Sequence, residues 1–478
     1  MSLPFIQELT QPPSVPQALR ALADREGIAL LDSSLQRGEL GRYSFLMAEP
    51  FEQFRLDHPE YRQDPFAEIR KRINGLAAST IKGLPPFQGG AAGVLGYELG
   101  RCFERLPELP DDFDLPIVMI GLYSWVLAWD HQQQRCWFID HGFPESTPSA
   151  RVQLARSRWE SISRALAAET LPTDRDWCDD RSTHCDRIEA AYRKMVPLEQ
   201  TPAVRSNFSR EGYLQAVQAV IDKIFAGDIF QANLSQRFLT PATRSPIEQY
   251  LKLRQQNPAT FAGYLAFDDW AILSSSPERF LRLHGKQVST RPIKGTRGRR
   301  PRPEEDLFSQ DELRESNKDR AENVMIVDLL RNDLSRVCLP GSIQVTELCN
   351  VEVYETVSHL VSEVCGTLRE EFTFWDLLGA TFPGGSITGA PKIRAMEIIS
   401  EQEQIARGPY CGSLFYLGFD GTADSNILIR TMTQRKGWLT FSAGGGIVSR
   451  SVPEEEYAET LHKARGMINS LSPGPESK

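Results

Sequence analysis

The 478-residue chain contains many short strand-like segments that are not separated by regularly alternating helices. Segments such as 117–130, 136–140 and 260–267 are apolar runs bounded by turn residues, and no βαβ rhythm links them. Parallel strands need long crossover connections, usually helices, so this pattern favours antiparallel pairing. We therefore predict an α+β fold in which large antiparallel sheets are flanked by helices.

A polar stretch with few periodic apolar residues, 172–208, divides the chain. We expect this stretch to be a linker between an N-terminal region, 1–171, and a C-terminal region, 209–471. Length alone permits two or three domains or one interlocked unit. At the start of the second region, Ser209 is placed to cap an amphipathic helix that ends near Gly227.

The composition excludes several classes of protein. Hydrophobic residues make up 41% and charged residues 24%, with a net charge of −9, which is typical of a soluble globular chain but not of a nucleic-acid-binding one. No apolar run reaches the roughly 20 residues that a membrane-spanning helix needs. Residues 1–16 lack the basic and apolar parts of a signal peptide, so we expect a cytoplasmic location. The eight cysteines form no CxxC pair, so neither a zinc site nor a disulfide framework is predicted.

Lys294 is the first candidate for chemistry. It lies in the segment 291–297, Arg-Pro-Ile-Lys-Gly-Thr-Arg, between a proline-led turn and a glycine. If its ammonium group is partly desolvated there, it can lose its proton and become a nucleophile. The alternative is one more exposed lysine in a basic loop.

Two acidic pairs have their members three positions apart on predicted helices, namely Asp319 with Glu322 and Glu456 with Glu459. The members of each pair share a helix face. Brought together, the pairs would form an all-oxygen site suited to Mg²⁺. The alternative for each pair is a solvated helix face, and Ser451 with Glu454 has the spacing of a capping box at the start of the second helix.

Two glycine-rich segments allow close approach of a ligand. The loop 382–392 contains Ser386 and runs into a predicted helix, whose free N–H groups suit an anion. Glycines 444–446 also let backbone approach a ligand closely. Either segment can equally be only a turn.

Three single residues carry open alternatives. Arg430 is placed on an apolar strand and, if buried, needs an anion, either a structural acid or a substrate carboxylate. His359 is a candidate site residue or a satisfied core histidine. Glu278 is a candidate acid or the partner of Arg279 in a structural ion pair. The basic run 297–302 has no interleaved aromatic residues and is followed by acids, so it indicates a solvated loop.

Together these segments resemble the chorismate-utilising enzymes, which include the component I chains of anthranilate synthase and aminodeoxychorismate synthase, and the isochorismate and salicylate synthases. The matching pieces of the second half, in family order, are 227–235, 275–278, 291–297, 318–322, 328–333, 382–392, 429–431, 444–446 and 456–463. The N-terminal half matches at 30–33, 41–44 and 86–89. The resemblance implies the chorismate-utilising enzyme fold.

Two positions separate the branches of this family. Isochorismate and salicylate synthases carry a water-activating lysine where this chain has Gln231, and anthranilate synthases carry alanine where it has Lys294. Lysine in the second position marks the aminodeoxychorismate branch. The resemblance therefore implies conversion of chorismate and ammonia to 4-amino-4-deoxychorismate, a precursor of 4-aminobenzoate and folate. The alternatives are anthranilate synthase component I, in tryptophan biosynthesis, and an idle paralogue that only binds a partner, which the intact candidate residues disfavour.

The resemblance also implies roles for individual residues. The Lys294 amine would attack C2 of chorismate as the C4 hydroxyl departs, ammonia would then attack C4 and expel the lysine, and Glu278 would be the general acid/base near that hydroxyl. The cofactor Mg²⁺ would be held, directly or through water, by Asp319, Glu322, Glu456 and Glu459. The chorismate site would be lined by Gln231, Thr296, His359, Ser386, Tyr410, Arg430, Gly444, Gly446 and Lys463.

The resemblance implies two further binding partners. No cysteine of this chain has the setting of a triad glutamine amidotransferase, so ammonia is expected from a separate amidotransferase subunit. In these families the N-terminal half can also hold a tryptophan. The residues that match that pocket are Leu31, Ser33, Tyr43, Asn233 and Phe261, with plain core packing as the alternative.

Overall fold

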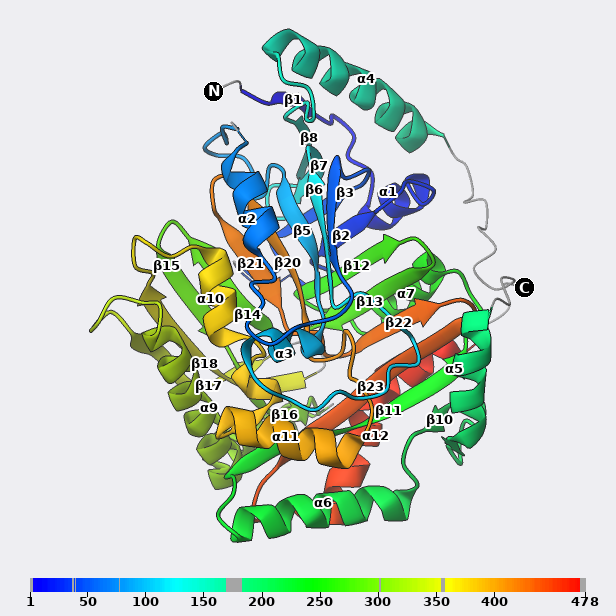
Figure 1. Ribbon diagram of the computed structural model, residues 1–478, viewed down its shortest axis with the longest axis vertical. Coiled ribbons are helices and arrows are strands. Elements are labelled where there is room, and N and C mark those ends of the chain that lie inside the picture. The colour runs from blue at the N-terminus through cyan, green and yellow to red at the C-terminus, as the bar shows by residue number, and fades with distance from the viewer. Residues whose placement is uncertain are drawn as a thin grey trace.

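The computed structural model describes residues 3–36, 38, 40–76, 78–168, 183–300, 302–353 and 357–472. Within these residues the strands form two antiparallel sheets, one of 13 strands and one of 10, with helices around them (Figure 1). The predicted α+β fold with large antiparallel sheets is therefore confirmed. No helix in the described part of the chain is long and apolar enough to cross a membrane.

The two sheets have the following strand orders. The first sheet runs β1 (Phe5–Glu8), β8 (Arg135–Asp140), β7 (Trp125–Asp130), β3 (Tyr43–Met47), β2 (Ala29–Asp32), β12 (Phe261–Phe267), β13 (Trp270–Ser276), β22 (Thr431–Arg435), β23 (Trp438–Ile447), β11 (Gln231–Pro241), β10 (Arg205–Ser206) and β9 (Val196–Pro197), and β19 (Gly389–Ala390) pairs with β11. The second sheet runs β16 (Ile293–Gly298), β18 (Val357–Thr367), β15 (Gln287–Arg291), β14 (Arg279–His284), β21 (Ala423–Asn426), β20 (Ser413–Gly418), β5 (Gly90–Leu95), β6 (Val118–Tyr123) and β4 (Glu52–Leu56), and β17 (Gln344–Val353) pairs with β18.

Each sheet takes strands from both regions of the chain. In the first sheet β2 pairs with β12, with Leu31 opposite Gly263. In the second sheet β5 pairs with β20, with Val94 opposite Leu414. Apolar side chains from both sheets, among them Phe45 and Leu414, form one buried cluster. The N-terminal region 1–171 and the region 209–471 therefore form one interlocked unit.

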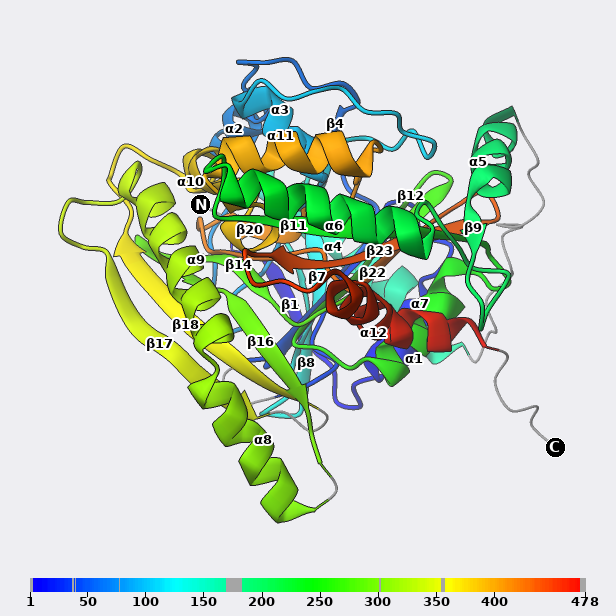
Figure 2. The ribbon, with the colours of Figure 1, turned by 90° about the horizontal axis from the view of Figure 1, so that it is seen from below.

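Helices pack against both sheets. An apolar cluster with the first sheet includes α1 (Val15–Ala21), α4 (Pro148–Ala167), α7 (Pro246–Gln256) and α12 (Pro453–Leu471). A cluster with the second sheet includes α2 (Ala67–Asn74), α3 (Gly100–Phe103), α9 (Asn317–Ser335) and α10 (Phe374–Thr381). A third cluster joins α6 (Arg210–Phe225) and α11 (Lys392–Glu403) to β11. Figure 2 shows α6 beside α11, and α8 (Pro303–Glu315) continuing into α9 along β16 and β18.

The predicted linker 172–208 is only partly described. Residues 183–208 contain α5 (Thr183–Lys194) and the strands β9 and β10, and β10 pairs with β11 in the first sheet. This part of the prediction is wrong, because the polarity of the segment belongs to the exposed side of a short helix. Ile188 on α5 is buried against the core, and Tyr192 packs on Trp438 with ring centroids 5.0 Å apart. Residues 172–182 lie outside the described residues.

Two local predictions can be compared directly with the hydrogen bonds. Ser209 caps α6 as expected, because its Oγ accepts from the backbone N of Gly212 at 3.0 Å. The capping box of Ser451 and Glu454 is wrong. The residue before α12 is Val452, without a side-chain cap, and the Ser451 hydroxyl instead donates to Glu456 Oε1 at 2.6 Å. The hydroxyl therefore serves a buried carboxylate and not the helix end.

Candidate active site

The candidate site lies where the chain passes from one sheet to the other. β21 belongs to the second sheet and β22 to the first, so residues 427–430 form the crossing. The Ile427 N–H donates to the carbonyl of Glu278 at 3.1 Å, and the Arg430 carbonyl accepts from Ser275 at 3.1 Å. The crossing thus runs beside the segment that joins β13 to β14. Arg430 has a φ of 50° and is not part of a strand, contrary to the prediction.

Arg430 is a partly exposed residue whose guanidinium group lies largely inside the protein. Burial lowers the pKa of its guanidinium group, and no neighbouring charge offsets this effect. Among the described residues, none forms an ion pair with its side chain, so the structural-acid alternative is not observed within them. A buried arginine without a counter-ion is unfavourable. A ligand carboxylate would supply the missing charge and a planar partner for the guanidinium fork.

Glu278 is a buried carboxyl group with 4% of its surface exposed. Burial raises its pKa to about 7, although a hydrogen bond from Ser386 and the charge of Lys294 act in the opposite direction. The Ser386 hydroxyl donates to Glu278 Oε1 at 2.6 Å. The ion-pair alternative is wrong, because Arg279 pairs with Asp424 at 2.9 Å. A carboxyl group with a pKa near neutrality suits general acid/base chemistry.

Lys294 lies on β16 and points toward the same loop. Its Nζ donates to the carbonyl of Ser386 at 2.8 Å. Burial lowers the pKa of the amine, and the nearby carboxylates of Glu322 and Glu278 offset this effect only in part. The residue as a whole is partly exposed, but its amine is not that of a solvated surface lysine. Ser386 therefore bridges the two candidate catalytic side chains, through its hydroxyl to Glu278 and its carbonyl to Lys294.

Gly295 shapes the strand on which Lys294 lies. The register between β16 and β18 shifts between Lys294 and Thr296, and Gly295 in between has a φ of 74°. A Cβ on Gly295 would lie 3.0 Å from the carboxyl carbon of Asp319. Only glycine combines this conformation with the close approach of α9. Beyond the shift, Thr296 Oγ1 lies 2.8 Å from Nδ1 of the buried His359, so this histidine has a polar partner.

Gln231 carries a buried amide. The residue is fully buried, and neither polar atom of its side chain forms a hydrogen bond with any of the described residues. Gly446 makes room for this amide, because a Cβ there would lie 2.5 Å from Gln231 Nε2. An unsatisfied buried amide is unfavourable by about 1–3 kcal/mol. A polar ligand at this position would remove that penalty.

The remaining candidates lie around the same strands. Gly444 is opposite Ser235 in the β11–β23 pair, and its carbonyl accepts from Lys463 Nζ at 2.8 Å. Tyr410 is buried in the segment before β20, and the guanidinium carbon of Arg407 lies 5.7 Å from the centre of its ring. No contact of the Tyr410 side chain with Glu278 or Lys294 is seen in the described residues.

The four predicted metal ligands come from α9 and α12. Asp319 pairs with Arg297 at 3.1 Å, Glu456 with Lys318 at 3.2 Å, and Glu459 with Lys463 at 2.7 Å. Burial, helped by the charges of Asp319 and Glu456, raises the pKa of Glu322 to about 7, although the charges of Lys294 and Lys318 act in the opposite direction. In the described part of the chain, no three His, Cys, Asp or Glu side chains lie close enough together to hold a metal ion.

These carboxylates fit Mg²⁺ by their chemistry. All are hard oxygen donors, and the crowding of negative charge around Glu322 is the situation that a dication relieves. A cation in their midst would have to replace the pairings with Lys318, Lys463 and Arg297. The four carboxylates are therefore suitable donors for Mg²⁺. For them to converge on one ion, these ion pairs must open.

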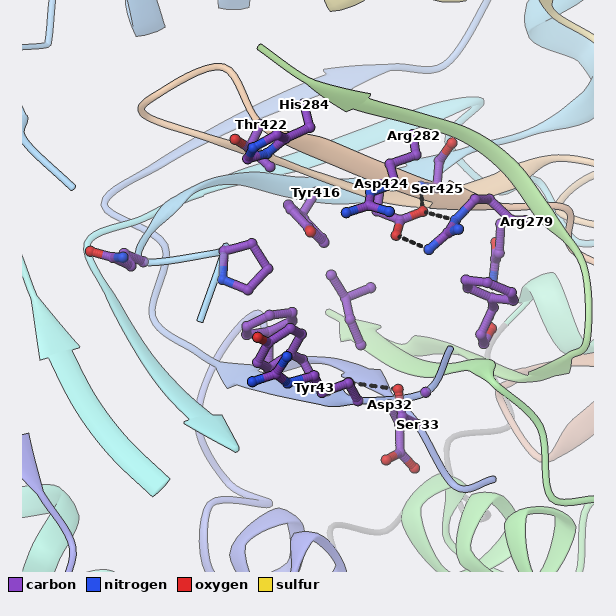
Figure 3. A pocket seen from close by; sticks show the side chains of 18 of the residues that line it. Asp32, Ser33, Tyr43, Arg279, Arg282, His284, Tyr416, Thr422, Asp424 and Ser425 are labelled. Atoms are coloured by element: carbon purple, nitrogen blue, oxygen red, sulfur yellow. Dashed lines mark hydrogen bonds and ion pairs between the residues drawn. The ribbon is translucent and has the colours of Figure 1, made fainter. Parts of the chain in front are cut away.

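The predicted tryptophan pocket overlaps a cavity of about 810 Å³ between the two sheets (Figure 3), and neither Glu278 nor Lys294 lines this cavity. Leu31, Ser33, Tyr43 and Phe261 line it, as predicted. Asn233 does not, because β11 is separated from β2 by four intervening strands. Figure 3 shows Ser33 and Tyr43 on one side of the cavity and Tyr416, Arg279 and Asp424 on the other.

The family of the chain follows from comparison with known proteins. The family model of chorismate binding enzymes matches residues 28–469. The chain belongs to the chorismate binding enzyme family. It is 42% identical to aminodeoxychorismate synthase component 1 of Escherichia coli strain K12, over 81% of this chain and 78% of the relative. It is 37% identical to anthranilate synthase component 1 of Thermus thermophilus, over 98% and 96%.

Solved structures of this family have the same fold. Anthranilate synthase component I from Streptococcus pneumoniae matches with a TM-score of 0.74 and 30% identity, covering 91% of this chain and 93% of that one. The menaquinone-specific isochorismate synthase from Escherichia coli matches with a TM-score of 0.71 over 98% and 96%, and at 17% identity it shows the fold alone. The predicted chorismate-utilising enzyme fold is therefore confirmed.

The raised pKa of Glu278 makes a prediction about stability. Its pKa rises from an unfolded value of 4.5 to about 7, so the folded state binds the proton more tightly. This favours folding below pH 4.5 and is lost as the pH rises to 7. Glu278→Gln should therefore stabilise the protein at pH 8 by roughly 1–3 kcal/mol relative to its effect at pH 4.

Thermal and urea unfolding at the two pH values measures this difference. The matched control is Glu370→Gln, because the side chain of Glu370 is 89% exposed and should give the same small effect at both. Equal effects of Glu278→Gln at pH 4 and pH 8 would contradict the raised pKa.

Proposed function

We propose that this chain converts chorismate and ammonia to 4-amino-4-deoxychorismate and water. The observation that carries the proposal is the pairing of a desolvated amine, Lys294, with a buried carboxyl group, Glu278, through the single residue Ser386. Relatives named aminodeoxychorismate synthase component 1 support it. The alternative is anthranilate synthase, because relatives of that name are 34–37% identical over almost the whole chain.

The two side chains divide the work of the first step. The lowered pKa of Lys294 increases the fraction of neutral amine, which attacks C2 of chorismate. The ring double bonds shift and the C4 hydroxyl leaves. Glu278, with a pKa of about 7, is half protonated near neutral pH and can give that hydroxyl the proton with which it departs as water.

In the second step the double bonds shift in the opposite direction, and ammonia is the nucleophile. Ammonia attacks C4, the double bonds shift back and Lys294 leaves C2 as the free amine. The proton that ammonia loses returns to Glu278, so the enzyme ends in its starting state. Two successive displacements place nitrogen at C4, whereas a single attack by ammonia at C2 would lead to anthranilate.

Other residues of the site would orient chorismate. The unpaired guanidinium group of Arg430 suits a substrate carboxylate. The amide of Gln231 has unused donor and acceptor atoms but no basic amine, so it can bind a polar group without activating water as a lysine there would. The rest of the chorismate site would be lined by His359, Thr296, Tyr410, Lys463, Gly444 and Gly446.

The proposed partners follow from the reaction. Ammonia would come from a glutamine amidotransferase subunit, and the component 1 names of the relatives agree with a second component. The product would feed 4-aminobenzoate and folate synthesis after a lyase step. A cytoplasmic location is part of this proposal.

Replacement of Lys294 tests the reaction. With chorismate, Mg²⁺ and excess ammonium, the wild-type chain should give 4-amino-4-deoxychorismate, detected by mass spectrometry and convertible to 4-aminobenzoate by an added lyase. Lys294→Ala should lower this product by about 10³-fold or more, because a nucleophile cannot be replaced by its neighbours. The matched control is Lys286→Ala, since Lys286 lies outside the site and contacts backbone carbonyls of 369–372.

Two results would contradict the proposal. Formation of the 4-amino product by Lys294→Ala at the wild-type rate would remove the covalent role of the lysine. Anthranilate and pyruvate from the wild-type chain would instead favour the alternative.

We also propose that Asp319, Glu322, Glu456 and Glu459 hold Mg²⁺, which would anchor the ring carboxylate of chorismate when bound. Binding can be measured by calorimetry without any substrate. Glu322→Gln and Glu456→Gln should each weaken Mg²⁺ binding by at least about tenfold, since each removes a charged oxygen donor. Glu454→Gln is the control, because Glu454 is exposed on the first turn of α12. Absence of Mg²⁺ binding by the wild-type chain at millimolar concentration would exclude the site.

We propose in addition that the cavity of Figure 3 binds tryptophan. Its size falls in the usual range for small-molecule sites, and the residues that line it include Tyr43, Phe45, Phe261 and Tyr416. L-Tryptophan at 100 times its Kd should stabilise the chain by about 2.7 kcal/mol. Ser33→Phe places an aromatic ring in the cavity and should abolish the thermal shift, and D-tryptophan serves as the ligand control. No shift with wild-type protein, and no tryptophan in its denatured extract, would sink this assignment.

A further inference from the structure

Arg407 is a buried cation outside every set of residues predicted from the sequence. It lies between α11 and β20, with 3% of its side chain exposed. Its Nε and Nη2 donate to the two carboxylate oxygens of Glu403 at 2.8 and 2.7 Å. Its remaining donors reach two other elements, the carbonyl of Asn233 on β11 at 2.6 Å and the carbonyl of Ile387 at 3.1 Å. One guanidinium group therefore ties three elements together.

The same network continues on both sides of Arg407. Glu403 Oε1 also accepts from the backbone N and the hydroxyl of Ser235, each at 2.8 Å. The Asn233 N–H donates to the carbonyl of Thr388 at 2.7 Å. The loop 385–388 is therefore held against β11 from two points. The strand β11 carries candidate site residues, because it begins at Gln231 and its Ser235 lies opposite Gly444.

The stability of the fold does not require a buried network of this kind. A buried ion pair often contributes no more to stability than well-packed apolar residues of the same volume. What an arginine adds is a rigid planar fork with fixed donor directions, which a lysine cannot reproduce. The contacts of Arg407 use that fork fully, because Nε, Nη1 and Nη2 all donate.

We propose that Arg407 is a positioning residue for the pair of Glu278 and Lys294, acting through the loop that carries Ser386. Ile387, which Arg407 holds, directly follows Ser386. Ser386 contacts both members of the pair, by its hydroxyl and by its carbonyl. A shift of this loop therefore moves the acid and the amine together and opens their surroundings to water. The reaction that Arg407 would serve rests on the proposed function, whereas the contacts of Arg407 are observed independently of it.

The test is Arg407→Lys in the full chain, with Arg158→Lys as the matched control. Arg158 is also a largely buried arginine that pairs with a buried carboxylate, Asp140 at 3.3 Å, and donates to the carbonyl of Phe143 at 2.8 Å. It lies on α4, outside the site. Lysine keeps the positive charge beside Glu403 in the first variant but cannot bridge three elements.

Two readouts are measured on each variant. The first is the pH dependence of Lys294 acetylation by acetic anhydride, read by peptide mass spectrometry. Arg407→Lys should move its midpoint upward by about one pH unit, a tenfold lower reactivity on the acid side, because water reaches the amine. The second is ammonia-dependent chorismate turnover, where kcat should fall by roughly 10–100-fold with KM changed less than about threefold. Arg158→Lys should leave both at wild-type values.

The outcomes separate this inference from the proposed function. An unchanged Lys294 midpoint in Arg407→Lys, with activity lost only in proportion to folded protein, would overturn the positioning role. If the Lys294 midpoint shifts in Arg407→Lys but the wild-type chain forms no aminodeoxychorismate, the positioning role stands and the proposed reaction is rejected. Should Arg407→Lys fail to fold, Glu403→Gln replaces it, with a smaller upward shift expected and no shift as the contrary result.

Discussion

Burial of charged groups at the junction of the two sheets is the constraint on which the rest of the site depends. Desolvation moves the pKa of Glu278 upward and the pKa of Lys294 downward, so both approach neutrality from opposite sides. At an exposed surface the same two residues would be a fully ionised acid and a fully protonated amine. The crossing 427–430 adds a third charge, the guanidinium group of Arg430, whose pKa burial lowers. The site is thus organised by the burial of groups that water normally stabilises.

Much of this arrangement can be predicted from the sequence where the determining contacts are local or the motif is long. The cap of α6 by Ser209 follows from a pattern within one segment, and the α+β fold class follows from the absence of regularly alternating helices along the chain. Contacts over long sequence separations cannot be predicted in this way. Arg279 pairs with Asp424, 145 positions away, and not with the adjacent Glu278. Likewise Asn233 matches a pocket position by sequence, but the strand order places it elsewhere.

Low apolar content explains why α5 is not predicted inside the expected linker. The helix is amphipathic, but polar residues dominate it, and it buries Ile188 in the core. Arg407 is missed for a different reason: its segment has no periodicity, and its importance arises only when β11, α11 and the loop 385–388 meet. The sequence around it shows only an arginine between an alanine and a glycine, which predicts no particular contact. A buried guanidinium group is recognised by its three-dimensional partners.

The similar identities to aminodeoxychorismate and anthranilate synthases have a physical reason. The sheets, the acidic residues and Arg430 would serve any reaction that binds chorismate and removes its C4 hydroxyl. The proposed reaction asks one thing more, that the group added at C2 must also leave. A lowered amine pKa helps both steps, since more of the nucleophile is neutral and a less basic amine is a better leaving group. The environment that desolvates Lys294 therefore fits a transient adduct at C2, from which ammonia at C4 can expel the lysine.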